Sequence, residues 1–252
     1  MSECFPDALY APGQREKYRQ AALNRRSVRA FCAAPDQRQT EALNSLCESV
    51  CLPGVRIVTG VCDDRLFVSF PVVGAVIGCR RYAAVIVDKT VPRSVLYAGV
   101  MGENLVLEAE SMGLSTCWVA GSFRRSRVEI ETGKNEKIAA VIAMGVSAET
   151  VTGARVRKKL SDICLQDPSS WPLWAFSAAE NVRIAPSALN RQPWRLAFSG
   201  RTLLLKRAPM ADDLSMGIAL QHMICGIGEK PYHVTLGTKA ETACLVSEDR
   251  TL

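Results

Sequence analysis

Two apolar segments, far apart in the chain, repeat the same arrangement of glycines. Each predicts a helix with a matched glycine inside it and another at its end, followed by a strand. An interior glycine destabilises a helix by about 1 kcal/mol relative to alanine, so it suits a position where another element packs closely. The repeat favours two related halves packed about a pseudo-two-fold axis through the two helices; the alternative is a chance similarity of two apolar helices. The matched residues, at one constant spacing, are Met101, Gly102, Leu105 and Gly113, then Met216, Gly217, Leu220 and Gly228.

The rest of the sequence pattern is that of a mixed α and β chain. Helix-forming runs, capping residues and terminal glycines predict helices at 14–24, 36–50, 92–112, 123–132, 171–181 and 213–225. Runs rich in β-branched residues predict strands at 55–61, 82–87, 115–119, 137–144, 194–198, 202–206, 232–236 and 242–246. A hairpin turn is expected at Ser199 and Gly200. We therefore expect an α+β fold.

Composition and cysteine placement exclude several classes of protein. The chain has 252 residues, 48% hydrophobic and 22% charged, which is ordinary for a soluble protein with a core. The net charge of +6 suits an anionic ligand, but no dense basic run interleaved with aromatics indicates a nucleic-acid partner. Ten cysteines without a Cys-x-x-Cys pair, and only two histidines, favour neither a disulfide scaffold nor a zinc site. Without a signal peptide or a membrane-length apolar run, we expect a cytoplasmic protein with reduced thiols and no metal.

Two segments carry polar side chains suited to a ligand. Residues 25–31, RRSVRAF, place three arginines and a hydroxyl in one loop, which can hold a phosphate or hydrogen-bond the carbonyls of a planar heterocycle. The alternative interpretation is a solvated basic helix end. Residues 185–194, APSALNRQPW, form a loop stiffened by two prolines, in which Ser187 and Asn190 can bond the edge of a ligand. The alternative there is a structural turn.

Two further segments complete the set. Residues 113–121, GLSTCWVAG, place small residues after a strand, where backbone amides can approach a ligand; the alternative is packing around Trp118. Residues 155–159, RVRKK, direct Arg155, Arg157 and Lys159 to one side of an extended chain, where they can converge on a phosphate. The alternative is a solvated charge run in a linker.

Together and in this order, the four segments resemble the FMN-dependent nitroreductase family, in its single-chain, two-half subgroup of the TM nitroreductase type. The family pattern holds an Arg-Arg-Ser-x-Arg motif, a Gly-Leu-x-x-x-Trp segment after a central helix, a basic pair, and an Ala-Pro-Ser-x-x-Asn-x-Gln-Pro-Trp loop. All four are present here between residues 25 and 194. The resemblance implies a nitroreductase-like fold of two pseudo-symmetric α/β halves, 1–165 and 166–252, fused in one chain like the family's homodimer.

The resemblance also implies which residues bind FMN. The phosphate would be held by Arg25, Ser27, Arg155 and Arg157, with Arg26 and Arg29 reaching either the phosphate or the N1/C2 edge of the flavin. The residues along the isoalloxazine would be Pro186, Ser187, Ala188 and Asn190, and backbone groups near N5 would come from Val119, Ala120 and Gly121, beside Trp118. No catalytic side chain is required, because the flavin N5 carries the hydride. Cys117 is interpreted as a packing residue.

The order of the segments departs from the usual family pattern. There the Pro-Ser loop follows soon after the arginine motif, whereas here that position, 50–55, reads VCLPGV and the loop lies in the second half. In the ordinary dimer the two segments come from different subunits, so this chain resembles that interface folded into one polypeptide. The second half lacks its own arginine motif. We therefore expect one FMN per chain, in a monomer that mimics a dimer or in a homodimer.

The resemblance implies ping-pong turnover. NADH or NADPH would reduce FMN and leave, and a small-molecule acceptor such as a nitroaromatic or a quinone would take the electrons. No glycine-rich dinucleotide motif follows a strand, so the nicotinamide is expected to stack on the flavin. Two alternatives stay open: a flavin-binding protein without turnover, which needs the same residues, and a basic protein associated with nucleic acid, which predicts strongly salt-dependent binding.

Overall fold

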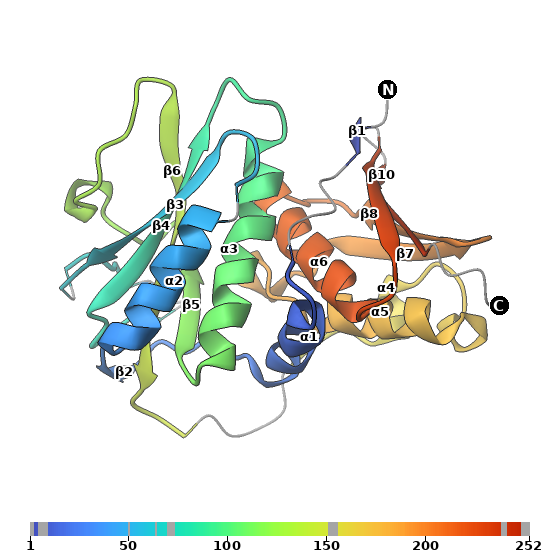
Figure 1. Ribbon diagram of the computed structural model, residues 1–252, viewed down its shortest axis with the longest axis horizontal. Helices are drawn as coiled ribbons and strands as arrows, with labels where there is room; N and C mark the ends of the chain where they lie inside the picture. Colours follow the sequence, from blue (N-terminus) through green and yellow to red (C-terminus); the bar gives the residue numbers. More distant parts are fainter. Residues whose placement is uncertain are drawn as a thin grey trace. The chain divides into compact units, whose positions relative to one another are not determined.

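The chain divides into two compact units (Figure 1). The central unit comprises Asn24–Arg155, and the terminal unit comprises Met1–Leu23 together with Val156–Leu252. The structure is a computed structural model, and it describes residues 3–4, 10–49, 51–63, 65–69, 74–150, 156–237 and 241–247.

The central unit is a five-stranded antiparallel sheet with two helices packed on it (Figure 1). Its strands run in the order β2-β6-β4-β3, and β5 also pairs with β6. Strand β4 is buried from Tyr82 to Val87, and α3 buries most of its residues, so these two elements form the middle of the core. The elements are β2 (Phe31–Ala33), α2 (Gln37–Ser49), β3 (Val55–Val61), β4 (Arg81–Asp88), α3 (Ser94–Ser111), β5 (Ser115–Val119) and β6 (Glu136–Ser147).

Local signals set the ends of both helices. At the start of α2, the Asp36 carboxylate accepts from the Gln39 backbone N–H at 2.7 Å, and the Gln39 side chain accepts from the Asp36 N–H at 2.9 Å. The two hydrogen bonds form a capping box, which satisfies two N–H groups that the helix itself cannot. Helix α3 ends before Gly113, whose φ of +79° is the left-handed conformation that favours glycine. The chain therefore turns sharply from α3 into β5.

The terminal unit is a second five-stranded antiparallel sheet, in the order β1-β9-β10-β8-β7. Helices α5 and α6 pack on each other, and α6 also contacts β10. The elements are β1 (Glu3–Cys4), α1 (Gln14–Asn24, of which Asn24 belongs to the central unit), α4 (Leu160–Ile163), α5 (Leu173–Ile184), β7 (Trp194–Ser199), β8 (Thr202–Arg207), α6 (Asp213–Gly226), β9 (Tyr232–Leu236) and β10 (Glu241–Ser247).

The two units repeat one topology. In each, a helix precedes an antiparallel hairpin, and a buried helix then leads into two further strands: α2-β3-β4-α3-β5-β6 in the central unit and α5-β7-β8-α6-β9-β10 in the terminal unit. The last strand of each series pairs with both the second and the third, as β6 does with β4 and β5, and β10 with β8 and β9. Gly228, like Gly113, has a positive φ. The glycine repeat in the sequence therefore marks a repeat of connectivity.

Most elements predicted from the sequence are present, within a few residues of their predicted bounds. The α+β class is confirmed, with the hairpin turn at Gly200, whose φ is +60°. The predicted helix at 123–132 is wrong: only Arg125–Arg127 forms a 3-10 turn. There Phe123, Val128 and Ile130 pack on the core cluster of the central unit from a largely extended chain, so tertiary burial overrides helix propensity.

Three short helices and strands, β1, β2 and α4, were not predicted. The loop expected around 25–35 contains β2, and the basic linker is followed by α4. The expected division at residue 165 lies between the two repeated series of elements. The compact units divide the chain differently, because Met1–Leu23 and the residues from Val156 onward both belong to the terminal unit. Compactness does not test a division into related halves, which stays a prediction. Among the described residues, no helix is long and apolar enough to cross a membrane.

We predict that Gly226→Ala destabilises the protein. A Cβ at this position would lie 2.5 Å from the Ala178 Cα and 2.9 Å from the Asn181 Cβ, because α6 packs closely on α5. The clash should lower the free energy of unfolding by about 1–3 kcal/mol, although alanine is the better helix former. Urea unfolding measures the change. Gly121→Ala is the control, since a Cβ there meets no atom within 4 Å. A Gly226→Ala protein as stable as the parent would contradict the close packing.

Candidate functional site

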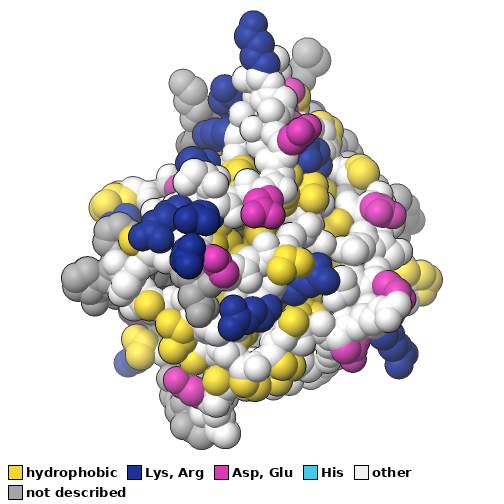
Figure 2. Space-filling model, turned by 90° about the vertical axis from the view of Figure 1, so that its left-hand side faces the viewer, with side chains coloured by type: hydrophobic (Ala, Val, Ile, Leu, Met, Phe, Trp, Pro, Cys, Tyr) yellow, Lys and Arg dark blue, Asp and Glu magenta, His cyan; other side chains and the backbone are white. Residues whose placement is uncertain are grey.

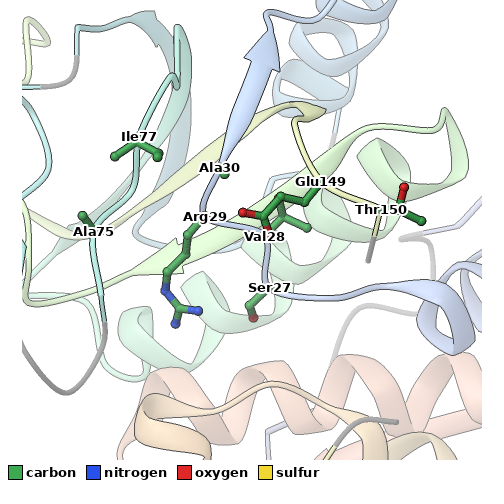
Figure 3. Close-up of a pocket in the computed structure, with 8 residues that line it drawn as sticks. All are labelled: Ser27, Val28, Arg29, Ala30, Ala75, Ile77, Glu149 and Thr150. Carbon is green, nitrogen blue, oxygen red and sulfur yellow. The ribbon is translucent and has the colours of Figure 1, made fainter. Parts of the chain in front are cut away.

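A pocket of about 420 Å³ opens in the central unit, within the range of small-molecule sites (Figure 3). One wall is the segment 27–30, which belongs to the arginine motif. Facing walls come from Ala75 and Ile77 and from the two residues Glu149 and Thr150 shortly after β6. The pocket thus forms around a segment that the sequence singled out for ligand binding.

Backbone hydrogen bonds hold the arginine motif extended. The Val28 N–H donates to the Thr116 carbonyl at 3.0 Å, beside the start of β5. On the other side, the Ile77 N–H donates to the Arg29 carbonyl at 2.8 Å. In an extended chain successive side chains alternate in direction. Val28 is therefore buried in the core, whereas Ser27 and Arg29 are exposed and extend to the same side of the segment (Figure 3).

The first arginine of the motif has a different environment. Arg25 is 1% exposed, and its Nε lies 3.8 Å from a carboxylate oxygen of Glu103, which is fully buried in α3. The other Glu103 oxygen accepts from the Trp118 indole N–H at 2.8 Å. Arg25 Nε and Nη2 have no hydrogen-bond partner in the part of the chain that the structure describes. Burial lowers the pKa of Arg25, and the charge of Glu103 opposes that effect.

The segment around Trp118 is built by close packing. A Cβ on Gly102 would lie 2.2 Å from the Trp118 ring, so the interior glycine of α3 leaves space for the indole. Beyond β5, Ala120 and Gly121 are exposed, and the space around Gly121 is open. Burial raises the pKa of the Cys117 thiol, against the opposing charges of Arg29 and Arg25. A buried thiol with a raised pKa is a poor nucleophile, which agrees with a packing role.

The Pro-Ser loop of the terminal unit has a strained backbone. Leu189, Asn190 and Gln192 have φ values of +51°, +54° and +48°, a region that non-glycine residues seldom occupy. Each such residue costs on the order of 1–3 kcal/mol and persists only where surrounding contacts enforce it. Residues of this kind are common at binding sites, so the strain supports a functional role for the loop.

The contacts that enforce the strain come from the basic segment. Asn190 donates through Nδ2 to the Val156 carbonyl at 3.0 Å, and its Oδ1 accepts from Arg157 Nη1 at 2.8 Å. Gln192 is buried, and its Oε1 accepts from the Lys158 N–H at 2.8 Å. The Gln192 N–H donates to the Ser187 hydroxyl at 2.8 Å. The two segments therefore form one hydrogen-bonded assembly.

The predicted site residues fall into groups. Ser27 and Arg29 line the pocket, Arg25 and Trp118 meet at Glu103, and Arg157 meets the Pro-Ser loop. Arg155 lies outside the described residues. Arg26 is half-buried and donates to the carbonyls of Asn24 and Arg25. Of the other predicted residues, Val119 and Pro186 are buried, Ser187 is half-buried, and the exposed ones are Ala120, Gly121, Ala188 and Asn190. Their roles in binding FMN stay predictions.

Sequence reasoning missed several residues. Glu103 carried a signal, because it is an acidic residue in the middle of an apolar helix. Gln192 lies inside the Ala-Pro-Ser-x-x-Asn-x-Gln-Pro-Trp motif, but its hydrogen bond to the Lys158 N–H was not predicted. Ala75, Ile77 and Glu149 carried no signal, since their place at the pocket depends on tertiary pairing. No group of acidic, histidine or cysteine side chains suited to a metal ion occurs among the residues described.

The charge distribution is uneven at the surface. On the face drawn in Figure 2, Lys and Arg side chains gather in groups, whereas Asp and Glu side chains are scattered. Inside the pocket, the Arg29 cation is accompanied by one carboxylate, that of Glu149. An anionic group of a ligand is therefore favoured beside Ser27 and Arg29 and disfavoured beside Glu149.

We predict that removing either charge of the buried pair lowers stability. Glu103→Gln keeps an acceptor for Trp118 but removes the carboxylate beside the buried Arg25 charge, and Arg25→Met removes the guanidinium beside the buried Glu103 carboxylate. Each should lower the free energy of unfolding by about 3–5 kcal/mol, measured in urea. The double variant Arg25→Met/Glu103→Gln buries no charge, so it should be more stable than either single variant. A double variant less stable than both would show that the pair is not the source of the loss.

Comparison with known proteins identifies a family for this chain. The family model described as "Putative TM nitroreductase" matches residues 18–227. The crystal structure of a "putative nitroreductase" from Thermotoga maritima MSB8 matches with a TM-score of 0.67 at 21% identity, covering 97% of this chain and all (100%) of the other. A search among curated proteins found no match.

Two shorter structures match part of the chain. An FMN-dependent nitroreductase from Clostridium difficile R20291 has a TM-score of 0.43 at 15% identity, covering 64% of this chain and 98% of its own. A nitroreductase family protein from Streptococcus pneumoniae TIGR4 has a TM-score of 0.47 at 14% identity, covering 57% and 96%. These scores are too low to support an argument. The family model spans most of the sequence and the Thermotoga structure shares the fold, so this chain belongs to the TM nitroreductase family.

Proposed function

We propose that the protein is an FMN-dependent NAD(P)H oxidoreductase of the nitroreductase type, reducing nitroaromatic or quinone-like acceptors. One observation carries the proposal: the arginine motif directs Ser27 and Arg29 into a single pocket of about 420 Å³. Membership of the family supports the same reaction class.

The residues at the pocket fit a flavin nucleotide. A guanidinium and a hydroxyl supply donors for a phosphate or for the carbonyl edge of a planar ring. Ala75 and Ile77 supply apolar surface on a facing wall. The Glu149 carboxylate would repel a phosphate, so we place anionic groups of the ligand beside Ser27 and Arg29.

FMN, when bound, supplies the hydride chemistry itself, accepting from a nicotinamide and donating to an acceptor. The side chains of this protein have supporting roles in the proposal. Arg29 would place a cation beside the N1/C2 edge or the phosphate, and Ser27 would donate a hydrogen bond. Val119, Ala120 and Gly121 would offer backbone groups to the ligand, which suits the open space around Gly121. No side chain is required to act as a nucleophile.

The Pro-Ser loop and the basic segment are the second group of residues in the proposal. Arg157 and Asn190 hydrogen-bond to each other, and the loop backbone is held in a strained shape. Preorganised polar groups of this kind lose little conformational entropy on binding. We propose that Ser187, Ala188 and Asn190 contact FMN and that Arg157 either holds the phosphate or positions Asn190.

We predict that Arg29→Ala weakens FMN binding by about 10- to 100-fold, because one charge-assisted hydrogen bond contributes roughly 1.5–3 kcal/mol. Asn190→Ala should weaken it about 10-fold, by removing a polar contact and loosening the loop. Purified protein is mixed with FMN and titrated by flavin fluorescence, and retained flavin is read from the visible spectrum after desalting.

Arg38→Ala is the control for lost positive charge, since Arg38 is exposed on α2 and does not line the pocket. It should bind FMN like the parent protein. No retained flavin in the parent at micromolar protein would refute the proposed cofactor. Loss in Arg29→Ala with none in Asn190→Ala would remove the Pro-Ser loop from the site.

We predict ping-pong kinetics with NADH or NADPH and a nitroaromatic or quinone acceptor. Initial rates at several acceptor concentrations should give parallel double-reciprocal lines, because the nicotinamide leaves before the acceptor binds. Anaerobic addition of NAD(P)H alone should bleach the bound flavin. Flavin that binds but is not bleached by either nicotinamide would favour a flavin-binding protein without turnover.

A further inference from the structure

Two cysteines of the central unit lie beside each other at the end of the β3–β4 hairpin where the chain leaves β3 and later enters β4. Cys62 directly follows β3, and Cys79 lies two residues before β4. The Cys62 N–H donates to the Arg80 carbonyl at 3.1 Å, which continues the ladder between the two strands. The sulfur atoms are 3.9 Å apart. The pairing of the hairpin therefore fixes the two thiols side by side, although they are well separated in sequence.

The two thiols differ in their access to solvent. Cys62 is half-buried, whereas Cys79 is completely buried in the core cluster. Cys62 Sγ lies 3.5 Å from the Cys79 carbonyl oxygen, and Cys79 Sγ lies 3.0 Å from the Arg81 carbonyl oxygen. A disulfide has a sulfur–sulfur distance of about 2.05 Å, so the sulfurs must approach by roughly 2 Å. Side-chain rotation and small backbone shifts supply movements of that size.

We propose that Cys62 and Cys79 are a modification site: a pair that a peroxide oxidises to a disulfide and a dithiol restores. The Cys62 thiolate attacks one oxygen of hydrogen peroxide, so that an S–O bond forms as the O–O bond breaks. The product is a sulfenic acid, and the hydroxide that leaves takes up the thiol proton and becomes water. Cys79 sulfur then attacks the Cys62 sulfur, forming the S–S bond and releasing a second water. In balance, two thiols and one hydrogen peroxide give one disulfide and two waters. Cys62 reacts first because it is the accessible thiol.

The disulfide would act on the wall of the pocket. Between Cys79 and the wall residue Ile77 lies Gly78, where a Cβ would be only 2.1 Å from the Phe31 carbonyl oxygen. The Ile77 carbonyl accepts from the Phe31 N–H at 3.0 Å, and its N–H donates to Arg29. The segment is thus packed tightly against the arginine motif. A covalent bond at Cys79 would restrict opening of this segment, independently of whether the pocket binds FMN.

The experiment uses the full-length protein treated with a small excess of hydrogen peroxide, then denatured and alkylated. Peptide mass mapping under non-reducing conditions should find Cys62 and Cys79 linked, and both should be alkylated after dithiothreitol. Cys62→Ala should leave Cys79 fully alkylated. Cys47→Ala is the matched control, because Cys47 is also half-buried and lies in α2, away from the pair. It should form the link like the parent.

Hydrogen exchange of peptides covering 74–79 gives a second readout. Oxidation should slow exchange several-fold in the parent and in Cys47→Ala, and leave Cys62→Ala unchanged. The proposal is overturned if Cys79 stays fully alkylated in the parent while the exposed Cys32 and Cys51 are oxidised. It is equally overturned if Cys62 links to another cysteine. Both results come from the parent protein, so they do not depend on the folding of a variant.

Discussion

A charge pair buried in the central unit sets the position of the arginine motif. Moving an arginine and a glutamate out of water costs several kcal/mol for each ion, and only their mutual attraction and further hydrogen bonds offset this. Glu103 meets these conditions from the interior of α3, since it lies 3.8 Å from Arg25 and accepts from the Trp118 indole, whereas the cost of burying Arg25 is offset by the attraction to Glu103. The pair therefore ties the start of the motif to the helix and to β5. From that anchor an extended chain presents Ser27 and Arg29 to the pocket.

The same anchor explains Gly102 inside α3. A helix that must accept a tryptophan ring against its backbone has no space for a side chain at Gly102. In the terminal unit Gly226 has a comparable role, because α6 approaches α5 closely there. Gly102 and Gly226 thus lie at close contacts. The two apolar helices also occupy the same place in two series of elements with the same strand pairing. A repeat seen first as spacing in the sequence is a repeat of topology.

Much of the fold is predictable because its signals are local. The capping box at Asp36, the terminal glycine of α3 and the β-branched run of β4 each act over a few residues. The helix expected at 123–132 is absent because its apolar residues pack on a core assembled from distant strands, which no local pattern encodes. Ser27 and Arg29 are predicted as site residues because they belong to one local motif. Ile77 and Glu149 are not predicted, because only tertiary pairing brings them to the pocket. Arg25 shows the limit within a motif, since its sequence neighbours line a pocket while its own charge is buried.

The Pro-Ser loop shows that a motif need not contain the information for its own shape. Three of its residues occupy backbone conformations that they would leave if they were free to do so, and the restraints lie largely in the segment 156–158, about thirty positions earlier. A sequence pattern that recognises Ala-Pro-Ser-x-x-Asn-x-Gln-Pro-Trp therefore recognises only one partner of a two-part structure. Grafted into another protein without its basic partner, the loop would relax to ordinary turns. Recombination between relatives would have to exchange the basic segment and the loop together, because the loop keeps its backbone shape only with its hydrogen-bond partners in that segment.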